Sequence, residues 1–369
     1  MDKKETPALD GRYPVIVTLP NIAFCELTRT VSVFHPFLIF PKTYMLYTFA
    51  SIPLPRNMGY KAGMISTAFV PRAQRMDLDI RPESFGELEC SASILDNPQA
   101  LQERMRRNGY LFVRGFFQRV DVLAARRTVV GRLAALGFLE PGTDPMEAVA
   151  RKGAEFSFLP EVCKDNPELD NILYRGTLMD FYRNLFGEEV RHFDFTWFRA
   201  VAPGRGTGPH CDVVYMGRGT RDRLYTAWVP IGDIPLEVGG LMILEGSHHQ
   251  KDRLRSYLDR DVDAYCTNGR HADDIEAGRK NWEWDGTLSR NPVSLREKLG
   301  GRWLTTSFRA GDLLTFPMQT VHASLDNPSD RVRLSSDSRY QPASEPADER
   351  WVGENPIGHA LAGKLGRIC

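Results

Sequence analysis

After Arg191 the chain consists of short β-type runs separated by glycine- and proline-rich turns, and this pattern restricts the possible folds most strongly. Aromatic and β-branched residues fill the runs, whereas pairs such as Pro203-Gly204 and Asn327-Pro328 separate them. Several short strands punctuated in this way predict a β-sandwich or a barrel. The expected strands cover residues 192–201, 224–229, 240–244, 313–316 and 332–340.

The segment before these strands has helical periodicity instead. Asn97 precedes Pro98 at one end of the first helical stretch, and Asn108-Gly109 stop it at the other. Because helices precede the strands, the predicted fold class is α+β and mainly β, with a helical layer attached to the β core. Further helices are expected over residues 120–136 and 173–186, and a short strand over 110–113.

The 369 residues suffice for one large domain or two ordinary ones. We expect a single domain over residues 77–351, with a charged insertion over 246–304 and a C-terminal tail over 352–369. Residues 1–76 differ in composition, because no acidic residue follows Glu26 within them. This leader is interpreted as a poorly packed or non-native extension, with a targeting segment as the alternative. Prolines and a lysine interrupt its apolar run, so no membrane-spanning segment is expected.

The composition is that of a globular protein, with 42% hydrophobic residues, 25% charged residues and a formal net charge of zero. This balance favours a small-molecule substrate and argues against a nucleic-acid or membrane partner. The cysteines are scattered, which argues against a disulfide framework and against structural zinc. A reducing, cytoplasmic location is expected, with organellar targeting by the leader as the alternative. The six cysteines are Cys25, Cys90, Cys163, Cys211, Cys266 and Cys369.

His210 and Asp212 follow a glycine-rich loop and are the first candidate metal ligands. On a strand the two side chains would share one face, with Cys211 pointing away as a packed thiol. A His-x-Asp pair alone binds nothing in most proteins, so a third ligand is required. His322, directly after a predicted strand, is the best candidate among the remaining histidines, and His248 is the alternative. Two histidines and one carboxylate form the ligand set of non-heme Fe(II) oxygenases.

The segment DRVRLSSDSRY after His322 alternates between polar and apolar residues, as a strand does. A strand at the surface could show the same alternation. Beside a metal site, however, a strand that presents arginine and serine suits a dicarboxylate cosubstrate, because a bidentate cation binds the distal carboxylate of a 2-oxo acid. Residues on its polar face are Arg331, Arg333, Ser335, Asp337 and Arg339.

The stretch from His210 to Arg339 resembles the phytanoyl-CoA dioxygenase family of Fe(II)- and 2-oxoglutarate-dependent oxygenases. It shares with that family the His-x-Asp pair, the distal histidine and an arginine eleven residues after it, which is Arg333 here. The segments YTAWVPIGD, which contains Trp228, and GGLMILEGSH also match, as does Asn327. The resemblance implies a double-stranded β-helix, that is, a cupin-like jelly roll.

The same resemblance implies the roles of individual residues. His210, Asp212 and His322 would hold Fe(II) as catalytic residues, and Arg333 would bind 2-oxoglutarate, with Arg331 as the alternative. Cosubstrate contacts are also implied for Ser324 and Trp228, although Trp228 could equally be a core residue.

The implied activity is that of a dioxygenase that hydroxylates a C–H bond of a small molecule with dioxygen, releasing succinate and CO2 from 2-oxoglutarate. Asp212 favours hydroxylation, since related halogenating enzymes lack this carboxylate. One alternative is a non-catalytic jelly-roll protein that binds a metal or ligand, and another is a metal-dependent hydrolase or isomerase. Insertion 246–304 and the loop around Tyr215 are the expected specificity elements, and no motif identifies the substrate or the oligomeric state.

Overall fold

The computed structural model describes residues 32–33, 50–51, 69–280 and 284–369. The chain divides into two units, residues 1–64 and residues 65–369. In the first unit the described residues are two short antiparallel strands, β1 (Ser32–Val33) and β2 (Ala50–Ser51). Most of the predicted leader therefore lies outside the described residues.

The second unit begins before the predicted boundary at residue 77. Strands β3 (Arg72–Ala73) and β4 (Met76–Asp77) form a hairpin, and its turn contacts the β core. The backbone N–H groups of Gln74 and Arg75 donate hydrogen bonds of 3.2 and 2.7 Å to the carboxylate of Asp326. The last residues of the predicted leader are thus part of the folded unit.

Two facing β-sheets form the centre of the second unit. The major sheet has the order β6-β13-β9-β15-β7, with β8 also paired to β15, and the minor sheet has the order β14-β10-β12-β5. All of these strand pairs are antiparallel except β12 with β5. The major sheet consists of β6 (Leu111–Val113), β7 (Val190–His192), β8 (Trp197–Val201), β9 (Tyr225–Pro230), β13 (Leu313–Pro317) and β15 (Arg333–Pro342). The minor sheet consists of β5 (Phe85–Glu87), β10 (Leu241–Leu244), β12 (Trp303–Thr305) and β14 (His322–Ser324).

A buried apolar core joins the inner faces of the two sheets. Trp228 and Leu314 from the major sheet pack in the same cluster as Leu241 and Ile243 from the minor sheet. Alternating strand residues meet across such an interface because successive side chains point to opposite faces. The predicted jelly roll is confirmed.

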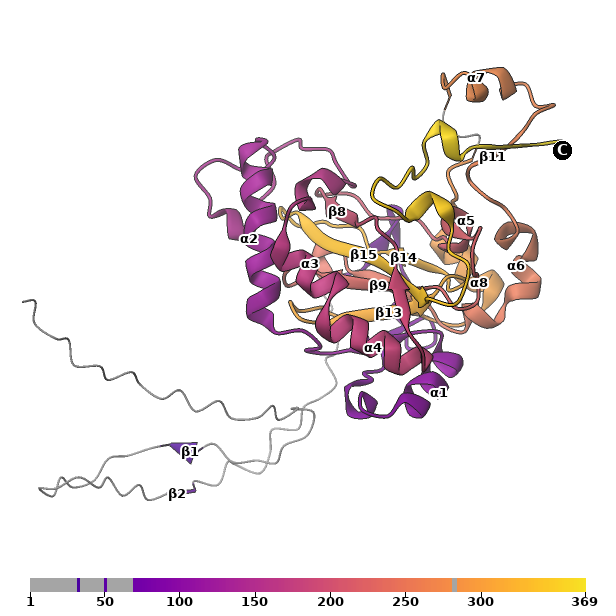
Figure 1. Cartoon of the computed structure of the whole chain (residues 1–369). Coiled ribbons are helices and arrows are strands. Elements are labelled where there is room, and N and C mark those ends of the chain that lie inside the picture. The colour runs from indigo at the N-terminus through magenta and orange to yellow at the C-terminus, as the bar shows by residue number, and fades with distance from the viewer. Residues whose placement is uncertain (1–31, 34–49, 52–68, 281–283) are drawn as a thin grey trace, which may run out of the picture. The chain divides into compact units, whose positions relative to one another are not determined.

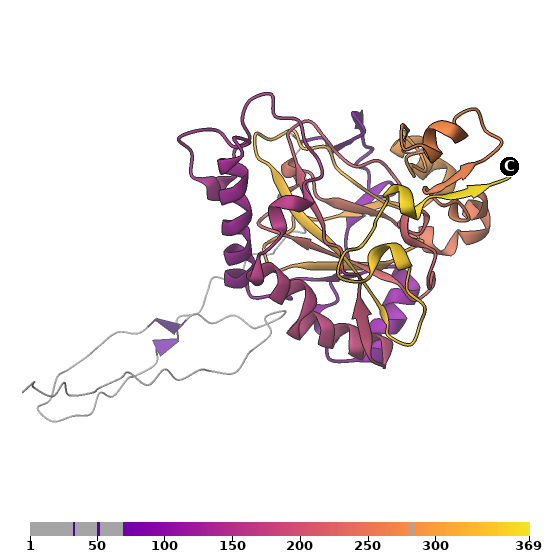
Figure 2. The same ribbon diagram turned by 45° about the horizontal axis from the view of Figure 1, so that its top comes forward.

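A helical layer covers the outer face of the major sheet, as predicted (Figures 1 and 2). The side chain of Asn97 accepts a hydrogen bond from the N–H of Ala100, and Gly109 ends the same helix with φ +71°, as the sequence signals indicated. The single helix expected over 173–186 is two helices, because the chain is extended at Arg175. The layer contains α1 (Pro98–Asn108), α2 (Arg119–Ala135), α3 (Pro167–Tyr174) and α4 (Gly176–Phe186).

The predicted insertion covers the outer face of the minor sheet. Leu254 and Leu258 of α6 (Lys251–Leu258) and Leu295 of α8 (Pro292–Leu299) pack into one apolar cluster with this sheet. The insertion ends before residue 303, because β12 is a strand of the minor sheet. Its remaining elements, β11 (Ala264–Cys266) and α7 (Ala272–Glu276), extend away from the sheets (Figure 1).

The C-terminal tail is joined to this insertion. Strand β16 (Leu365–Arg367) pairs in parallel with β11, and Cys266 and Cys369 form a disulfide. The scattered cysteines argued against a disulfide framework, and for Cys266 and Cys369 this expectation is wrong, because they form a disulfide. The pairing of β11 with β16 brings together two cysteines separated by 103 residues, which their spacing could not indicate.

Short connections complete the second unit. They include α5 (Val213–Met216) and 3-10 turns at Ala92–Ile94, Pro145–Glu147, Pro160–Cys163, Leu236–Val238, Ser247–His249, Glu349–Trp351 and Leu361–Gly363.

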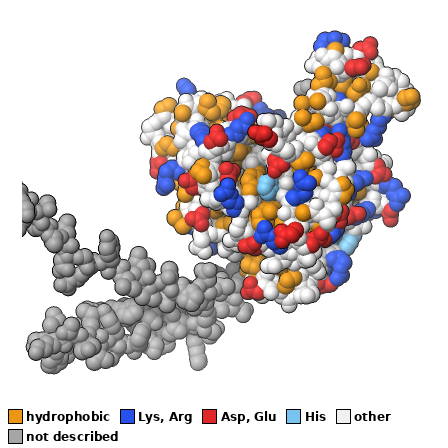
Figure 3. Space-filling model, viewed as in Figure 1, with side chains coloured by type: hydrophobic (Ala, Val, Ile, Leu, Met, Phe, Trp, Pro, Cys, Tyr) orange, Lys and Arg blue, Asp and Glu red, His pale blue; other side chains and the backbone are white. Residues whose placement is uncertain are grey.

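The described helices and the charges on the surface bear on the partners of the chain. Among the described residues, no helix has both the length and the apolar character that a membrane crossing requires. On the face seen in Figure 3, basic and acidic side chains are interspersed, so this face has no extended field of one sign.

Candidate metal and cosubstrate site

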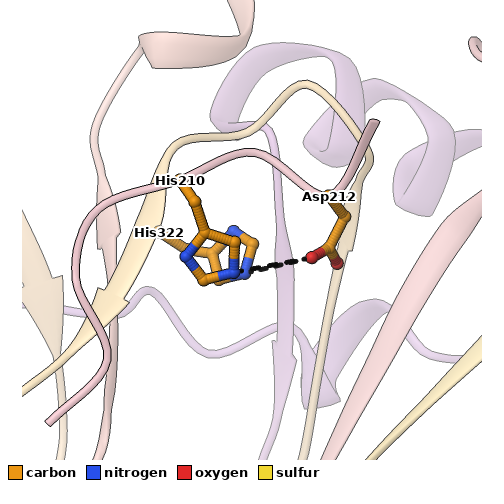
Figure 4. A group of neighbouring side chains, drawn as sticks. All are labelled: His210, Asp212 and His322. Atoms are coloured by element: carbon orange, nitrogen blue, oxygen red, sulfur yellow. Dashed lines mark ion pairs between the residues drawn. The ribbon is translucent and has the colours of Figure 1, made fainter. Parts of the chain in front are cut away.

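His210, Asp212 and His322 lie side by side at one end of the space between the sheets (Figure 4). His210 and His322 face each other across an isolated antiparallel bridge, in which each backbone N–H donates to the other's carbonyl at 3.0 Å. Asp212 does not share a strand face with His210, contrary to the sequence prediction. It has helical dihedral angles, φ −65° and ψ −23°, at the start of α5. This turn directs its carboxylate towards both rings, and the candidate ligand atoms lie within 4.8 Å of one another.

Backbone carbonyls set the orientation of both imidazole rings. Nδ1 of His210 lies 2.8 Å from the carbonyl oxygen of Gly208, and Nδ1 of His322 lies 3.0 Å from that of Thr320. A carbonyl only accepts, so each Nδ1 carries the proton and each Nε2 has a free lone pair. The two Nε2 atoms lie 3.7 and 3.6 Å from Oδ1 of Asp212. Burial, aided by His322, lowers the pKa of His210 to about 3, so that its neutral, metal-binding form prevails.

The carboxylate of Asp212 is held through its other oxygen. Oδ2 accepts hydrogen bonds from Oγ1 of Thr226 at 2.6 Å and from Nη2 of Arg339 at 2.9 Å. Burial alone would raise the pKa of Asp212, but Arg339 and the two histidines together hold it well below its usual range. Oδ1 of an ionised carboxylate therefore remains available beside two free Nε2 atoms. This donor set fits a divalent transition metal with open positions.

Arg333 is buried in the pocket that His210 and His322 also line. Its Nη1 donates to Oγ of Ser335 at 3.1 Å, whereas Nε and Nη2 have no partner among the described residues. Burial lowers the pKa of Arg333 to about 10, and the nearby charge of Arg199 adds to this effect. A buried guanidinium with two unpaired donors requires an anion, and a bidentate carboxylate satisfies both donors at once.

Ser324 and Trp228 line the same pocket. Oγ of Ser324 accepts a hydrogen bond from the backbone N–H of Thr207 at 2.8 Å. Trp228 belongs to the core between the sheets, where its ring lies 4.6 Å from that of Phe308, and its buried Nε1–H has no described partner. The two interpretations of Trp228, core residue and pocket wall, therefore both apply.

The residues considered as alternatives for these roles lie outside the pocket. Arg331 is half exposed and forms a 2.7 Å ion pair with Glu147, outside the pocket. His248 belongs to the 3-10 turn after β10, and its Nε2 lies 3.0 Å from the carbonyl oxygen of Arg106. Cys211 is buried, and burial raises the pKa of its thiol far above the usual range, which is not the environment of a nucleophile.

The glycine-rich loop before His210 is a tight packing loop. A side chain on Gly206 would come within 2.6 Å of the Asp326 carboxylate and 2.9 Å of the Leu325 carbonyl oxygen. Tyr215, from the expected specificity loop, stands edge-on to the His210 ring at 5.7 Å and donates to the carbonyl of Asp285 in the insertion. The two expected specificity elements thus meet at the site.

Three residues of the site were not singled out as site residues from the sequence. Thr226 binds Asp212, as described above, and Arg199 forms a 2.7 Å ion pair with Asp337 inside the pocket. The segment WFRAV places Arg199 as the one charged residue in an apolar strand, and this was the available signal. Thr226 carries no such signal, because a threonine in a strand is ordinary.

A protein-family model described as "Phytanoyl-CoA dioxygenase (PhyH)" matches residues 105–335 of this chain. Among curated relatives, the 1-deoxypentalenic acid 11-beta-hydroxylase of Streptomyces arenae is 26% identical over 273 residues, which is 71% of this chain and 87% of that protein. The enzyme of the same name from Streptomyces exfoliatus is 25% identical over 274 residues, covering 70% and 85%.

A similar solved structure is that of the non-heme alpha ketoglutarate dependent carbocyclase SnoK from nogalamycin biosynthesis. It aligns with a TM-score of 0.50 and 18% identity, over 76% of this chain and 96% of that chain. At this identity the likeness supports the fold, and it agrees with the two-sheet architecture described above.

Proposed function

The chain belongs to the phytanoyl-CoA dioxygenase family, and on that premise we propose that it is an Fe(II)- and 2-oxoglutarate-dependent dioxygenase that hydroxylates a C–H bond of a small molecule. One observation carries this proposal. His210, His322 and a buried, unsatisfied Arg333 line one pocket between the two sheets, and the carboxylate of Asp212 completes a cluster of three candidate metal ligands with the two histidines. A metal-dependent hydrolase or isomerase would use the same metal ligands, but its activity would not depend on 2-oxoglutarate.

The residues of the chain divide the work between two ends of the pocket. His210, Asp212 and His322 would hold the iron, and this ligand set would leave positions open for the cosubstrate and dioxygen. Arg333 would bind the distal carboxylate of 2-oxoglutarate through its unpaired donors. Ser324, which lines the same pocket, would also contact the cosubstrate. When bound, iron and 2-oxoglutarate supply the oxidising chemistry, in which dioxygen, 2-oxoglutarate and the substrate C–H bond give succinate, CO2 and an alcohol.

The protein also limits access of water to the site. Leu241, Phe316 and Ala323 form apolar walls of the pocket, together with the indole of Trp228. Excluding water protects a reactive oxidant from side reactions and strengthens the ionic contacts of the cosubstrate. Tyr215 lies between His210 and the insertion, because its ring contacts the His210 ring and its hydroxyl donates to the carbonyl of residue 285.

The relatives named above are hydroxylases of an organic acid, 1-deoxypentalenic acid. From them we extend to this chain the reaction type, hydroxylation, and the substrate class, a small organic acid. A non-catalytic binding protein on the same fold is the competing proposal. It would bind 2-oxoglutarate but release no succinate.

The test is succinate release from 2-oxoglutarate by protein loaded with Fe(II) without oxygen and then exposed to air. Wild-type protein should form succinate, and His210→Ala should form none because it lacks one iron ligand. His249→Ala is the matched control, since this histidine is exposed and outside the pocket. Absence of succinate from wild-type protein that binds both iron and 2-oxoglutarate would favour the binding protein.

A further inference from the structure

Arg199 presents a second guanidinium group to the pocket. It lies on β8, opposite Ser335 of β15, and its Nε donates to Oδ2 of Asp337 at 2.7 Å. No described residue accepts a hydrogen bond from its two Nη atoms. Its side chain is 23% exposed, whereas that of Asp337 is 7% exposed. The side chain of Arg199 is therefore partly accessible, and its two Nη groups have hydrogen-bond donors to offer.

The position of Arg199 places it on the open side of the site. Its guanidinium carbon lies 6.0 Å from the ring of Phe158, a side chain that is 41% exposed. Arg333, by contrast, is only 1% exposed and lies two residues from Ser335 along β15. The deep arginine and the accessible arginine are thus neighbours on one face of the major sheet, at different depths.

The charges of the site do not cancel. Three guanidinium groups face two carboxylates, Asp212 and Asp337. Arg339 is paired with Asp212 and Arg199 with Asp337, so Arg333 is the guanidinium without a carboxylate among the described residues. The distal carboxylate of 2-oxoglutarate would supply that partner, and the Nη donors of Arg199 would remain available to a further anion. The three guanidinium groups belong to Arg199, Arg333 and Arg339.

We propose that Arg199 is the substrate-anchoring residue and that it binds a single carboxylate group of the substrate through its free Nη donors. This inference rests on the proposed function and deepens it, because it assigns the acid group of the substrate to one residue. Asp337 is a positioning residue: its carboxylate holds Nε and thereby turns the Nη edge towards the pocket. The charged end of the substrate then lies beside Phe158, and its apolar body extends towards the metal ligands.

The test compares carboxylic acids with their uncharged methyl esters. Cyclohexanecarboxylate, adamantane-1-carboxylate and decanoate, each beside its ester, are titrated by calorimetry into oxygen-free protein loaded with Fe(II) and 2-oxoglutarate. The wild-type protein should bind at least one acid about ten-fold more tightly than its ester, since a hydrogen bond to a charged group contributes about 1.5 kcal/mol or more. Stimulation of succinate formation by the same compounds is the second measurement.

Substitution of Arg199 alone would leave Asp337 as a buried, unpaired carboxylate. The decisive variant is therefore the double substitution Arg199→Gln with Asp337→Asn, which removes both charges together. In it the preference for acid over ester should fall to within about two-fold, whereas Arg199→Lys should keep part of it. Arg331→Gln, the matched control at an exposed ion pair outside the pocket, should keep the full preference.

Two results overturn the inference: equal binding of every acid and its ester by wild-type protein, or an acid preference that survives in the double variant. Failure of the proposed function is a separate result, because binding of iron and 2-oxoglutarate is measured first in each sample. Wild-type protein that binds neither contradicts the proposed function, and the inference falls with it. Protein that binds both but prefers no acid contradicts the inference alone.

Discussion

The metal end and the arginine end of the pocket differ in which of their polar atoms lack a partner. At the metal end, Nδ1 of each histidine and Oδ2 of Asp212 have hydrogen-bond partners, and the three candidate ligand atoms are free. Nε and Nη1 of Arg339, which binds Asp212 through Nη2, are also buried without a described partner. At the arginine end, two nitrogens of Arg333 and the indole N–H of Trp228 are buried without a described partner. Both ends are built on β9, β14 and β15 together with the loop before α5.

This difference indicates two kinds of preorganisation. The candidate metal ligands are oriented by the protein itself, through backbone carbonyls and a threonine, without a metal. The arginine end keeps a buried cation whose partner must come from outside. Metal binding therefore adds an ion to ligands that are already oriented, whereas anion binding neutralises a buried positive charge that is unfavourable on its own. Each prediction below weakens one end and leaves the other intact.

Removal of a metal ligand should have the largest effect. In His322→Ala the iron loses one of three ligands, and succinate formation should fall roughly a thousand-fold or more. Thermal melting checks the cause, because Fe(II) at about 100 times its Kd should stabilise wild-type protein by about 2.7 kcal/mol and should not stabilise the variant. A variant that iron still stabilises to the same extent would exclude His322 as a ligand.

Removal of the deep arginine should come next. Arg333→Gln should raise the KM for 2-oxoglutarate about 100-fold, since loss of a buried charged contact costs about 2–5 kcal/mol. The apo protein should not be destabilised, because the lost guanidinium had no carboxylate partner. Steady-state kinetics and melting of the metal-free protein measure the two effects. An unchanged KM, or the same rise in the control Arg331→Gln, would contradict the role of Arg333.

The hydrogen bond that positions Asp212 should matter less. Thr226→Val removes the 2.6 Å contact to Oδ2 but keeps Arg339, so iron affinity should fall about ten-fold. Thr226→Ser keeps the hydroxyl and should restore most of the affinity. Anaerobic titration with Fe(II) gives both values. Equal loss in the two variants would mean that packing, and not the hydroxyl, is responsible.

The smallest effect is expected for the indole N–H at the arginine end. Trp228→Phe removes one unpaired buried donor and keeps most of the aromatic packing against Phe308. If this donor binds the cosubstrate, the KM for 2-oxoglutarate should rise about five-fold, as expected for one hydrogen bond. Iron affinity, measured in the absence of 2-oxoglutarate, should stay as in the wild type. A fall in iron affinity with an unchanged KM would contradict this role, because it would mean that the indole acts on the metal site and not on the cosubstrate.

Local pattern in the sequence was sufficient for many of the elements. Asn97 and Gly109 marked the ends of α1, and the turn residues after Arg191 separated strands that the structure contains. These signals succeed because capping and turn formation depend on residues a few positions apart. The strand expected over 192–201 is instead divided, because β7 ends at His192 and β8 begins at Trp197. The extended residue Arg175, which divides the helix expected over 173–186, was not predictable, because both halves keep apolar residues at helical spacing.

The sequence by itself determined the candidate ligands and their order, since a His-x-Asp pair, a distal histidine and an arginine eleven residues on are visible in one dimension, and the family resemblance carried by these residues implied the jelly roll. Tertiary structure alone decided how they are used. It placed Asp212 on a helical turn and not on a strand, and it joined Cys266 to Cys369. It also brought Thr226 into contact with Asp212 and Arg199 into contact with Asp337. These contacts link residues 14 to 138 positions apart, and their energies depend on burial and direction, which only the packed sheets create.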